Sequence, residues 1–153
     1  MKSIYSFVIY PLLIFTLSCR KRIEAEDKFV AYQISPEKGN IRLYWKNDDQ
    51  TILRSIAWLK NKVEASNLKL LFAMKGGMFE PDNSPKGLYI ENYRQLKSMD
   101  TLAGPGNFYL SPNGIFYLNQ NNQAGIVETK KFRQLPEIKY ATQSGPMLLV
   151  NRK

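Results

Sequence analysis

Two adjacent glycines, Gly76-Gly77, interrupt an apolar run and stand just before a polar loop that carries Glu80 and Asp82. A glycine pair weakens a strand, but it lets the backbone approach another backbone or a ligand closely. Main-chain N–H groups at such a site can hold an anion, and a nearby carboxylate can transfer a proton. Glu80 and Asp82 are therefore the candidate catalytic residues. The competing interpretation is structural: a strand end with a glycine bulge and a turn, and both carboxylates in solvent.

A second candidate site lies at the corner Thr142-Gln143-Ser144-Gly145-Pro146, between two apolar segments. Small polar side chains beside a glycine can present hydroxyl and N–H groups to an anion. The two candidate sites thus share one chemistry, the binding of a negative charge. A plain turn is the alternative interpretation of this corner.

Missing residue types exclude several classes of enzyme. The 153 residues contain no histidine and a single cysteine, Cys19. Ser-His-Asp and Cys-His catalysis and His-based zinc sites are therefore excluded, and proton transfer has to use Asp, Glu, Lys or Tyr. No spacing of oxygen ligands indicates a metal site, and no glycine-rich phosphate loop is present, so we expect neither a metal nor a cofactor.

The charge of the chain favours anionic partners. It carries 22 Lys and Arg against 13 Asp and Glu, a formal net charge of +9. The basic residues are scattered, and no recognition-helix, RNA-binding or zinc pattern is present, so we do not expect nucleic acid as a partner. Phosphate-bearing polymers or an anionic membrane surface fit this charge, and a solvated surface without an electrostatic role is the alternative.

Residues 1–18 have the pattern of a targeting segment. Lys2 precedes an apolar run that is shorter than the ~20 residues needed to span a bilayer. Ser18 directly before Cys19 resembles the signal of bacterial lipoproteins, whose cysteine is lipidated. We therefore expect an envelope protein, periplasmic or at the cell surface, that is anchored in the membrane through Cys19. An ordinary cleaved signal peptide and an uncleaved anchor are the alternatives. The charged stretch 19–28 predicts a tether.

A hairpin and a helix are predicted before the glycine pair. Residues 29–34 and 41–46 alternate apolar and polar side chains around a turn, which is typical of a β-hairpin. Helical spacing predicts a helix over 51–66, with Asp48 and Asp49 placed to cap it. Its apolar stripe is expected to pack in the core and consists of Ile52, Ile56, Leu59 and Val63.

Short strands and turns fill the rest of the chain. Together with the helix they predict an α+β domain, 29–153, with a mainly antiparallel or mixed sheet. Hairpin turns are expected at Asn92-Tyr93 and at 111–114. The expected strands are 70–74, 87–91, 94–97, 108–110, 115–118, 124–128, 138–143 and 147–150, with a short helix or turn at 130–135.

Four segments in this order indicate a protein family more specifically than any one of them alone. They are FAMKGGMF, SPKGLYIEN, GPGNFYLSPNGIFYL and YATQSGPMLLV. They resemble the bacterial phosphodiester glycosidase domain family. That family is related to the mammalian enzyme that uncovers mannose 6-phosphate by removing N-acetylglucosamine from a sugar phosphodiester. The resemblance covers residues 29–150 and implies an α+β hydrolase of glycan-related phosphodiesters. The substrate site that it implies consists of Gly76, Gly77 and Phe79, the segment Gly106-Asn107-Phe108, and the corner Gln143, Ser144 and Gly145.

The sequence departs from the family at two points. Lys75 stands where members usually carry Asn, so a donor-only cation replaces a side chain that both donates and accepts hydrogen bonds. We expect Lys75 to strengthen phosphate binding at the cost of the family's geometry. Members also continue into Arg-Asn-Gly-Val-Gly and Asp-Gly motifs that this sequence lacks. The chain is therefore expected to be an N-terminal, C-terminally truncated portion of the domain, with weak or no hydrolase activity.

Two other functions stay open. The first is a non-enzymatic, lipid-tethered module that holds an anionic glycan without cutting it. The second is a gene fragment without function, since the apolar run 147–150 has no neighbouring segment in the sequence to cover it. Release of free sugar from a sugar phosphodiester separates the hydrolase from the binding module.

Overall fold

The computed structural model describes residues 30–133 and 137–150 and divides the chain into two compact units, 1–31 and 32–153. The first unit has only residues 30 and 31 in the described ranges. The predicted signal segment 1–18, the lipidation site Cys19 and the predicted tether 19–28 therefore lie outside the described residues. Within the described ranges, no helix is both long and apolar enough to cross a membrane.

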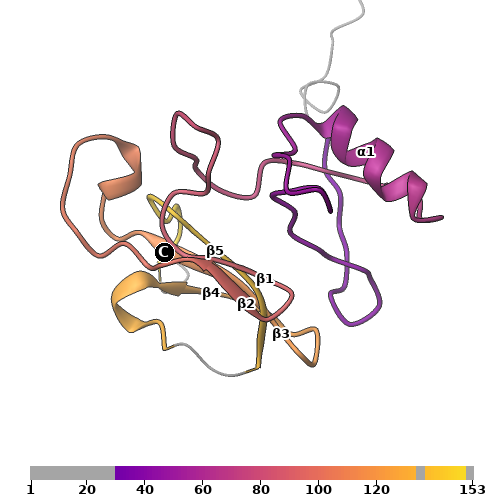
Figure 1. Cartoon of the computed structure of the whole chain (residues 1–153). Helices are drawn as coiled ribbons and strands as arrows, with labels where there is room; N and C mark the ends of the chain where they lie inside the picture. Colours follow the sequence, from indigo (N-terminus) through magenta and orange to yellow (C-terminus); the bar gives the residue numbers. More distant parts are fainter. Residues whose placement is uncertain (1–29, 134–136, 151–153) are drawn as a thin grey trace, which may run out of the picture. The chain divides into compact units, whose positions relative to one another are not determined.

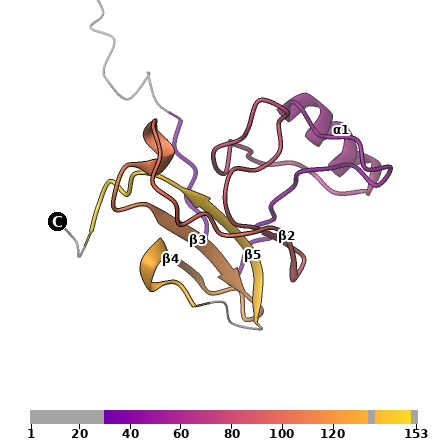
Figure 2. The same cartoon turned by 60° about the vertical axis from the view of Figure 1, so that its left-hand side comes forward.

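The second unit is an α+β fold with a five-stranded antiparallel sheet in the order β2-β1-β5-β3-β4 (Figure 1). The last strand in the sequence, β5, thus lies at the centre of the sheet, between β1 and β3. Figure 2 shows β3 and β5 side by side. The strands are β1 (Tyr89–Glu91), β2 (Arg94–Lys97), β3 (Gly114–Asn119), β4 (Ala124–Glu128) and β5 (Ile138–Ser144), and the helices are α1 (Ile56–Ala65) and the 3-10 turns η2 (Asn107–Tyr109) and η3 (Thr129–Lys131).

The turn between β1 and β2 is formed by Asn92 and Tyr93, which both have positive φ, 49° and 65°. Two such residues form the turn that suits the twist of a two-residue hairpin. Tertiary contacts hold it, because Tyr140 Oη donates to Asn92 Oδ1 at 2.7 Å and Tyr93 N donates to Lys139 O at 3.0 Å. The predicted hairpin at this turn is confirmed.

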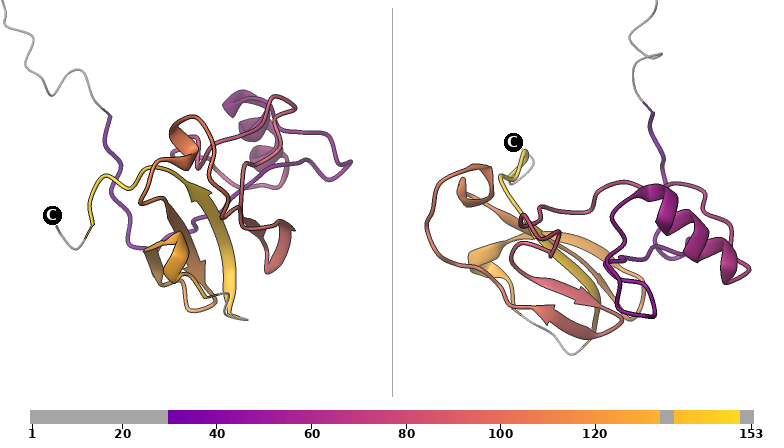
Figure 3. Two further views of the ribbon diagram at one scale, coloured as in Figure 1. Left: turned by 90° about the vertical axis from the view of Figure 1, so that its left-hand side faces the viewer. Right: turned by 45° about the horizontal axis from the view of Figure 1, so that its top comes forward.

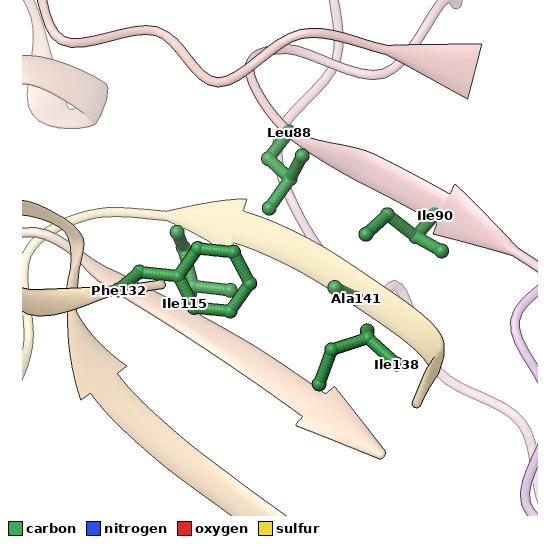
Figure 4. Close-up of a cluster of buried hydrophobic side chains, with 6 residues drawn as sticks. All are labelled: Leu88, Ile90, Ile115, Phe132, Ile138 and Ala141. Atoms are coloured by element: carbon green, nitrogen blue, oxygen red, sulfur yellow. The ribbon is translucent and has the colours of Figure 1, made fainter. Parts of the chain in front are cut away.

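The core of the sheet lies across its three central strands. Figure 4 shows the six buried side chains gathered around β1, β5 and β3. Each large aliphatic side chain buried in this way contributes on the order of 1.5–3 kcal/mol to folding. The six residues are Leu88, Ile90, Ile115, Phe132, Ile138 and Ala141.

The helix α1 begins later than the sequence predicted. Ser55, rather than Asp48 or Asp49, is its N-cap, because the Ser55 side chain accepts a hydrogen bond from Trp58 N. The predicted apolar stripe is not a core face, since Val63 is its one buried member among the described residues and the Ile56 side chain is 52% exposed. The helical spacing thus predicted a helix correctly, but the expected burial of its apolar stripe was wrong.

Five predicted strands are corrected. Residues 30–34 and 41–45 form no ladder; Lys46 pairs only with Ile52, in an isolated bridge. The runs 70–74 and 147–150 are also not strands. Residues 108–110 fall in and just after η2, which follows Gly106 at φ 89°, so the connection from β2 to β3 curls (Figure 3). The expected pairing of 108–110 with 115–118 is replaced by pairing of β3 with β4 and β5.

Candidate functional site

Three segments meet at the carboxyl end of β5. A Cβ added to Gly77 would stand 2.5 Å from Thr142 Oγ1, and one added to Gly145 would stand 2.6 Å from Phe108 O and 3.1 Å from Asn107 O. At Gly145 only glycine fits because two backbones touch, whereas at Gly77 a side chain would meet the Thr142 hydroxyl group. We call residues 75–87, 106–110 and 143–145 the loop cluster; the structure brings these segments together, and their role in substrate binding stays a prediction.

The Gln143 side chain is fully buried and fastens two loops to β5. Its Oε1 accepts hydrogen bonds from Leu88 N and from Asp100 N, both at 3.0 Å, and its Nε2 donates to Asp100 O at 2.6 Å. Gly87, at φ 72°, leaves room for this amide, because a Cβ there would stand 2.3 Å from Oε1. The amide thus positions the loops and none of its surface reaches solvent, while the substrate-binding role of Gln143 stays a prediction.

The loop after the glycine pair is a small hairpin with its own hydrogen bonds. Met78 O accepts from Lys86 N at 3.0 Å, and Glu80 N donates to Ser84 O at 2.8 Å. The exposed carboxylate of Asp82 accepts from Ser84 N at 2.9 Å, and this contact lowers the pKa of Asp82. A general acid needs a raised pKa, so Asp82 is better suited to holding the turn than to protonating a leaving group.

The ammonium group of Lys86 contacts two of the three segments of the loop cluster. Its Nζ lies 3.5 Å from Glu80 Oε1 and stands over two aromatic rings, 5.0 Å from the Tyr109 centroid and 5.4 Å from that of Phe108. The Lys86 side chain retains 23% exposure. An ammonium held against ring faces is attracted by their quadrupoles and loses conformational freedom. Glu80, the second candidate acid, therefore serves as the ion-pair partner of this cation.

The remaining predicted site residues lie at the surface of the cluster or in its main chain. Lys75 Nζ stands 4.7 Å from the ring centroid of Phe79, whose side chain is 50% exposed. Asn107 is exposed at the start of η2, and Ser144 is half-buried and pairs with Gly114 at the end of β5. The exposed Lys75 and Phe79 provide a second cation and ring on the same loop.

The arrangement can bind an anion that carries a ring. The lysines attract a phosphate or carboxylate, and the exposed ring of Phe79 can stack against a sugar. Within residues 30–133 and 137–150, no group of three or more Cys, Asp or Glu side chains is placed to hold a metal ion. The sequence analysis did not predict Lys86 as a site residue, although this lysine ends the polar loop that follows the glycine pair.

Glu91 is a second residue that the sequence did not reveal. Its Oε2 accepts hydrogen bonds from Tyr89 Oη at 2.9 Å and from Trp45 N at 3.2 Å. Partial burial raises the pKa of the Glu91 carboxyl, and burial also raises the pKa of Tyr89. Because Trp45 Nε1 donates to Asn83 O at 3.1 Å, the same tryptophan contacts Glu91 and the loop of the cluster. Local sequence patterns could not identify Glu91, because its partner Trp45 lies 46 residues away in the sequence.

A comparison with curated proteins finds one similar sequence. The chain is 33% identical over 121 residues to the uncharacterized protein YigE of Escherichia coli (strain K12). The aligned part is 79% of this chain and 47% of that protein, so the chain spans about half the length of the relative. No model of a protein family matches the chain, and no solved structure matches it.

Proposed function

We propose that this chain binds a sugar phosphodiester, or a similar anionic glycan, at the loop cluster. The observation that carries the proposal is Lys86: a partly exposed ammonium held over two aromatic rings and paired with Glu80. Lys75 over Phe79 adds a second cation and ring. A phosphate oxygen gains charge-assisted hydrogen bonds from such lysines, and the linked sugar gains contact with a ring face.

The loop backbone supports the same ligand. The contacts of Gly77 and Gly145 hold the two glycine segments against β5 and η2, so their main chain is positioned before a ligand arrives. Binding to a preorganised site loses less conformational entropy. The net charge of +9 attracts an anionic glycan from a distance.

Hydrolysis of the phosphodiester is the second candidate function. It is favoured by the meeting of the three segments that the resemblance to the phosphodiester glycosidases implies as the substrate site. In such a reaction, a carboxyl group protonates the leaving group while water attacks the sugar. Glu80 is then the remaining candidate acid, because Asp82 is held as a charged turn acceptor, and Glu80 has to leave its ion pair with Lys86 and take up a proton before it can act. We propose that turnover by this chain is weak or absent and that binding is its main activity.

The proposal also includes the place of the protein in the cell. The sequence favours a bacterial envelope lipoprotein anchored in the membrane through Cys19. The mass of the chain purified from its own cells tests this anchoring. Maturation of a lipoprotein adds acyl chains to Cys19, and cleavage before Cys19 removes residues 1–18. A mass equal to the unprocessed 17.7 kDa chain contradicts it.

Calorimetry on the full chain in detergent tests binding. The titrants are the methyl diester of N-acetylglucosamine 1-phosphate in both anomers, free N-acetylglucosamine and methyl phosphate. We expect the diester to bind best and Lys86→Gln to weaken it about tenfold, because a hydrogen bond to a charged group is worth about 1.5–3 kcal/mol. Lys60→Gln on α1 is the matched control, since Lys60 pairs only with Glu64 among the described residues.

The outcomes separate the two functions. Equal affinity of the diester and the free sugar, or an unchanged affinity in Lys86→Gln, contradicts binding at the loop cluster. Release of free N-acetylglucosamine that disappears in Glu80→Gln supports hydrolysis. Tight binding without release of sugar, in both the parent chain and Glu80→Gln, supports the binding module alone.

A further inference from the structure

A groove outside the loop cluster has the composition of a second binding site. It has a volume of about 530 Å³, within the range of pockets that hold small ligands. It lies between residues 42–50, the C-terminal half of α1 with the turn that follows, and the β1–β2 hairpin. Every segment that forms it belongs to the second unit, so the groove is a feature of one folded body.

Basic side chains predominate in the groove. Its walls carry Arg42, Lys46, Lys62 and Arg94 against the acidic Asp48 and Glu91. Lys62 is paired with Asp48 and also donates to Asn47 Oδ1 at 3.2 Å, so this lysine is largely neutralised. The other three basic residues make no ion pair among the described residues, and they give the groove its positive character.

The two arginines differ in how they are held. Arg42 Nε donates to Asn40 Oδ1 at 2.9 Å and its Nη1 lies 3.5 Å from Tyr44 Oη, so the guanidinium is oriented before any ligand binds. Arg94 begins β2 and is exposed, and its guanidinium group makes no hydrogen bond within the described ranges. Guanidinium groups suit phosphate and carboxylate oxygens because they can donate two parallel hydrogen bonds.

The rest of the lining suits hydroxyl groups. Glu91 has one carboxylate oxygen, Oε2, engaged by Trp45 and Tyr89, and its Oε1 has no hydrogen bond among the described residues. A carboxylate oxygen accepts hydrogen bonds from sugar hydroxyls. Asn92 uses its Oδ1 to accept from Tyr140, which leaves its NH₂ group as a donor. Donors and acceptors are therefore both available beside the arginines.

We propose that this groove is a binding site for a saccharide unit that carries a phosphate or a carboxylate. Arg42 and Arg94 hold the anionic group, and Glu91 and Asn92 hold hydroxyls of the sugar ring. The groove is distinct from the loop cluster, and its occupation does not depend on the function proposed for that cluster. Trp45 connects the two places, because it contacts Glu91 through its main chain and Asn83 through its indole.

Nuclear magnetic resonance on the full chain in detergent tests the groove. Glucose 6-phosphate, glucuronate, glucose and inorganic phosphate are titrated separately, and the amide signals of Asn92 and Arg94 are followed. We expect the two anionic sugars to shift these signals and to bind at least fivefold more tightly than glucose or phosphate. The stronger of the two shows which anionic group the site prefers.

Two substitutions on one strand locate the effect. Arg94→Gln is expected to weaken the preferred sugar at least fivefold, whereas Lys97→Gln, which makes the same charge change on β2 outside the groove, leaves affinity within twofold. Equal thermal melting of the two variants shows that folding is preserved. Equal weakening by both, no shift at Asn92 and Arg94, or anionic sugars that bind no better than phosphate overturns the proposal. Lys86→Gln separates the two sites, because it changes the loop cluster alone.

Discussion

Replacement of Gly76 and Gly77 by alanine, one at a time, should change the free energy of unfolding differently. A Cβ on Gly77 meets the buried Thr142 Oγ1 at 2.5 Å, closer than real Cβ contacts allow, whereas a Cβ on Gly76 meets Leu43 Cδ2 at an ordinary 3.5 Å. Neither glycine has positive φ, so backbone strain does not enter the comparison. Overpacking lowers the free energy of unfolding by about 1–3 kcal/mol. Where the methyl group fits, Gly→Ala raises it by about 0.4–1 kcal/mol, because alanine lowers the conformational entropy of the unfolded chain. We expect Gly77→Ala to lose about 1–2 kcal/mol and Gly76→Ala to lose none.

Urea unfolding followed by tryptophan fluorescence measures both variants. Thr142→Ala provides the internal test, because it removes the Oγ1 and leaves Thr142 Cβ at 3.7 Å from the new methyl group. Gly77→Ala should therefore cost about 1 kcal/mol less in a Thr142→Ala background. The reasoning is refuted if both alanine variants shift the unfolding free energy equally, or if removal of the hydroxyl does not reduce the cost at Gly77.

Three further substitutions test the loops, the groove and the helix. Gln143→Leu orphans the buried N–H of Leu88 and the half-buried N–H of Asp100 and should cost about 2–5 kcal/mol in urea unfolding, with Gln95→Leu on the exposed face of β2 near zero; a loss under ~1 kcal/mol contradicts the role of the Gln143 amide. Since burial raises the folded-state pKa of Glu91, the folded chain holds this proton more tightly than the unfolded chain. The stability of the parent relative to Glu91→Gln should therefore fall as the pH rises above 4.5, the ordinary pKa of this carboxyl, and a constant difference would refute the burial effect. Ser55→Ala removes the N-cap of α1 and should lower the unfolding free energy by about 1 kcal/mol; no change would show that the cap adds nothing.

Local patterns in the sequence determined several elements of the fold. The strands at 115–118, 124–128 and 138–143 and the turn at Asn92-Tyr93 were predicted within one or two residues. These patterns work because alternation and turn chemistry act between residues close in sequence. The α+β class followed from the same signals.

Pairings between distant segments were decided only by the tertiary structure. Local alternation cannot tell which strand lies beside which, so the hairpin expected at 29–46 was wrong, and β5 at the sheet centre was not foreseen. The same holds for the candidate site. The polar character of Gln143 suggested a ligand contact, but its amide is buried and bonds to Leu88 and Asp100, 55 and 43 residues away. Lys86 over its rings and Glu91 against Trp45 likewise depend on contacts that only the folded chain creates. A side chain's type limits what it can bind, and burial and partners, set by the fold, decide what it does bind.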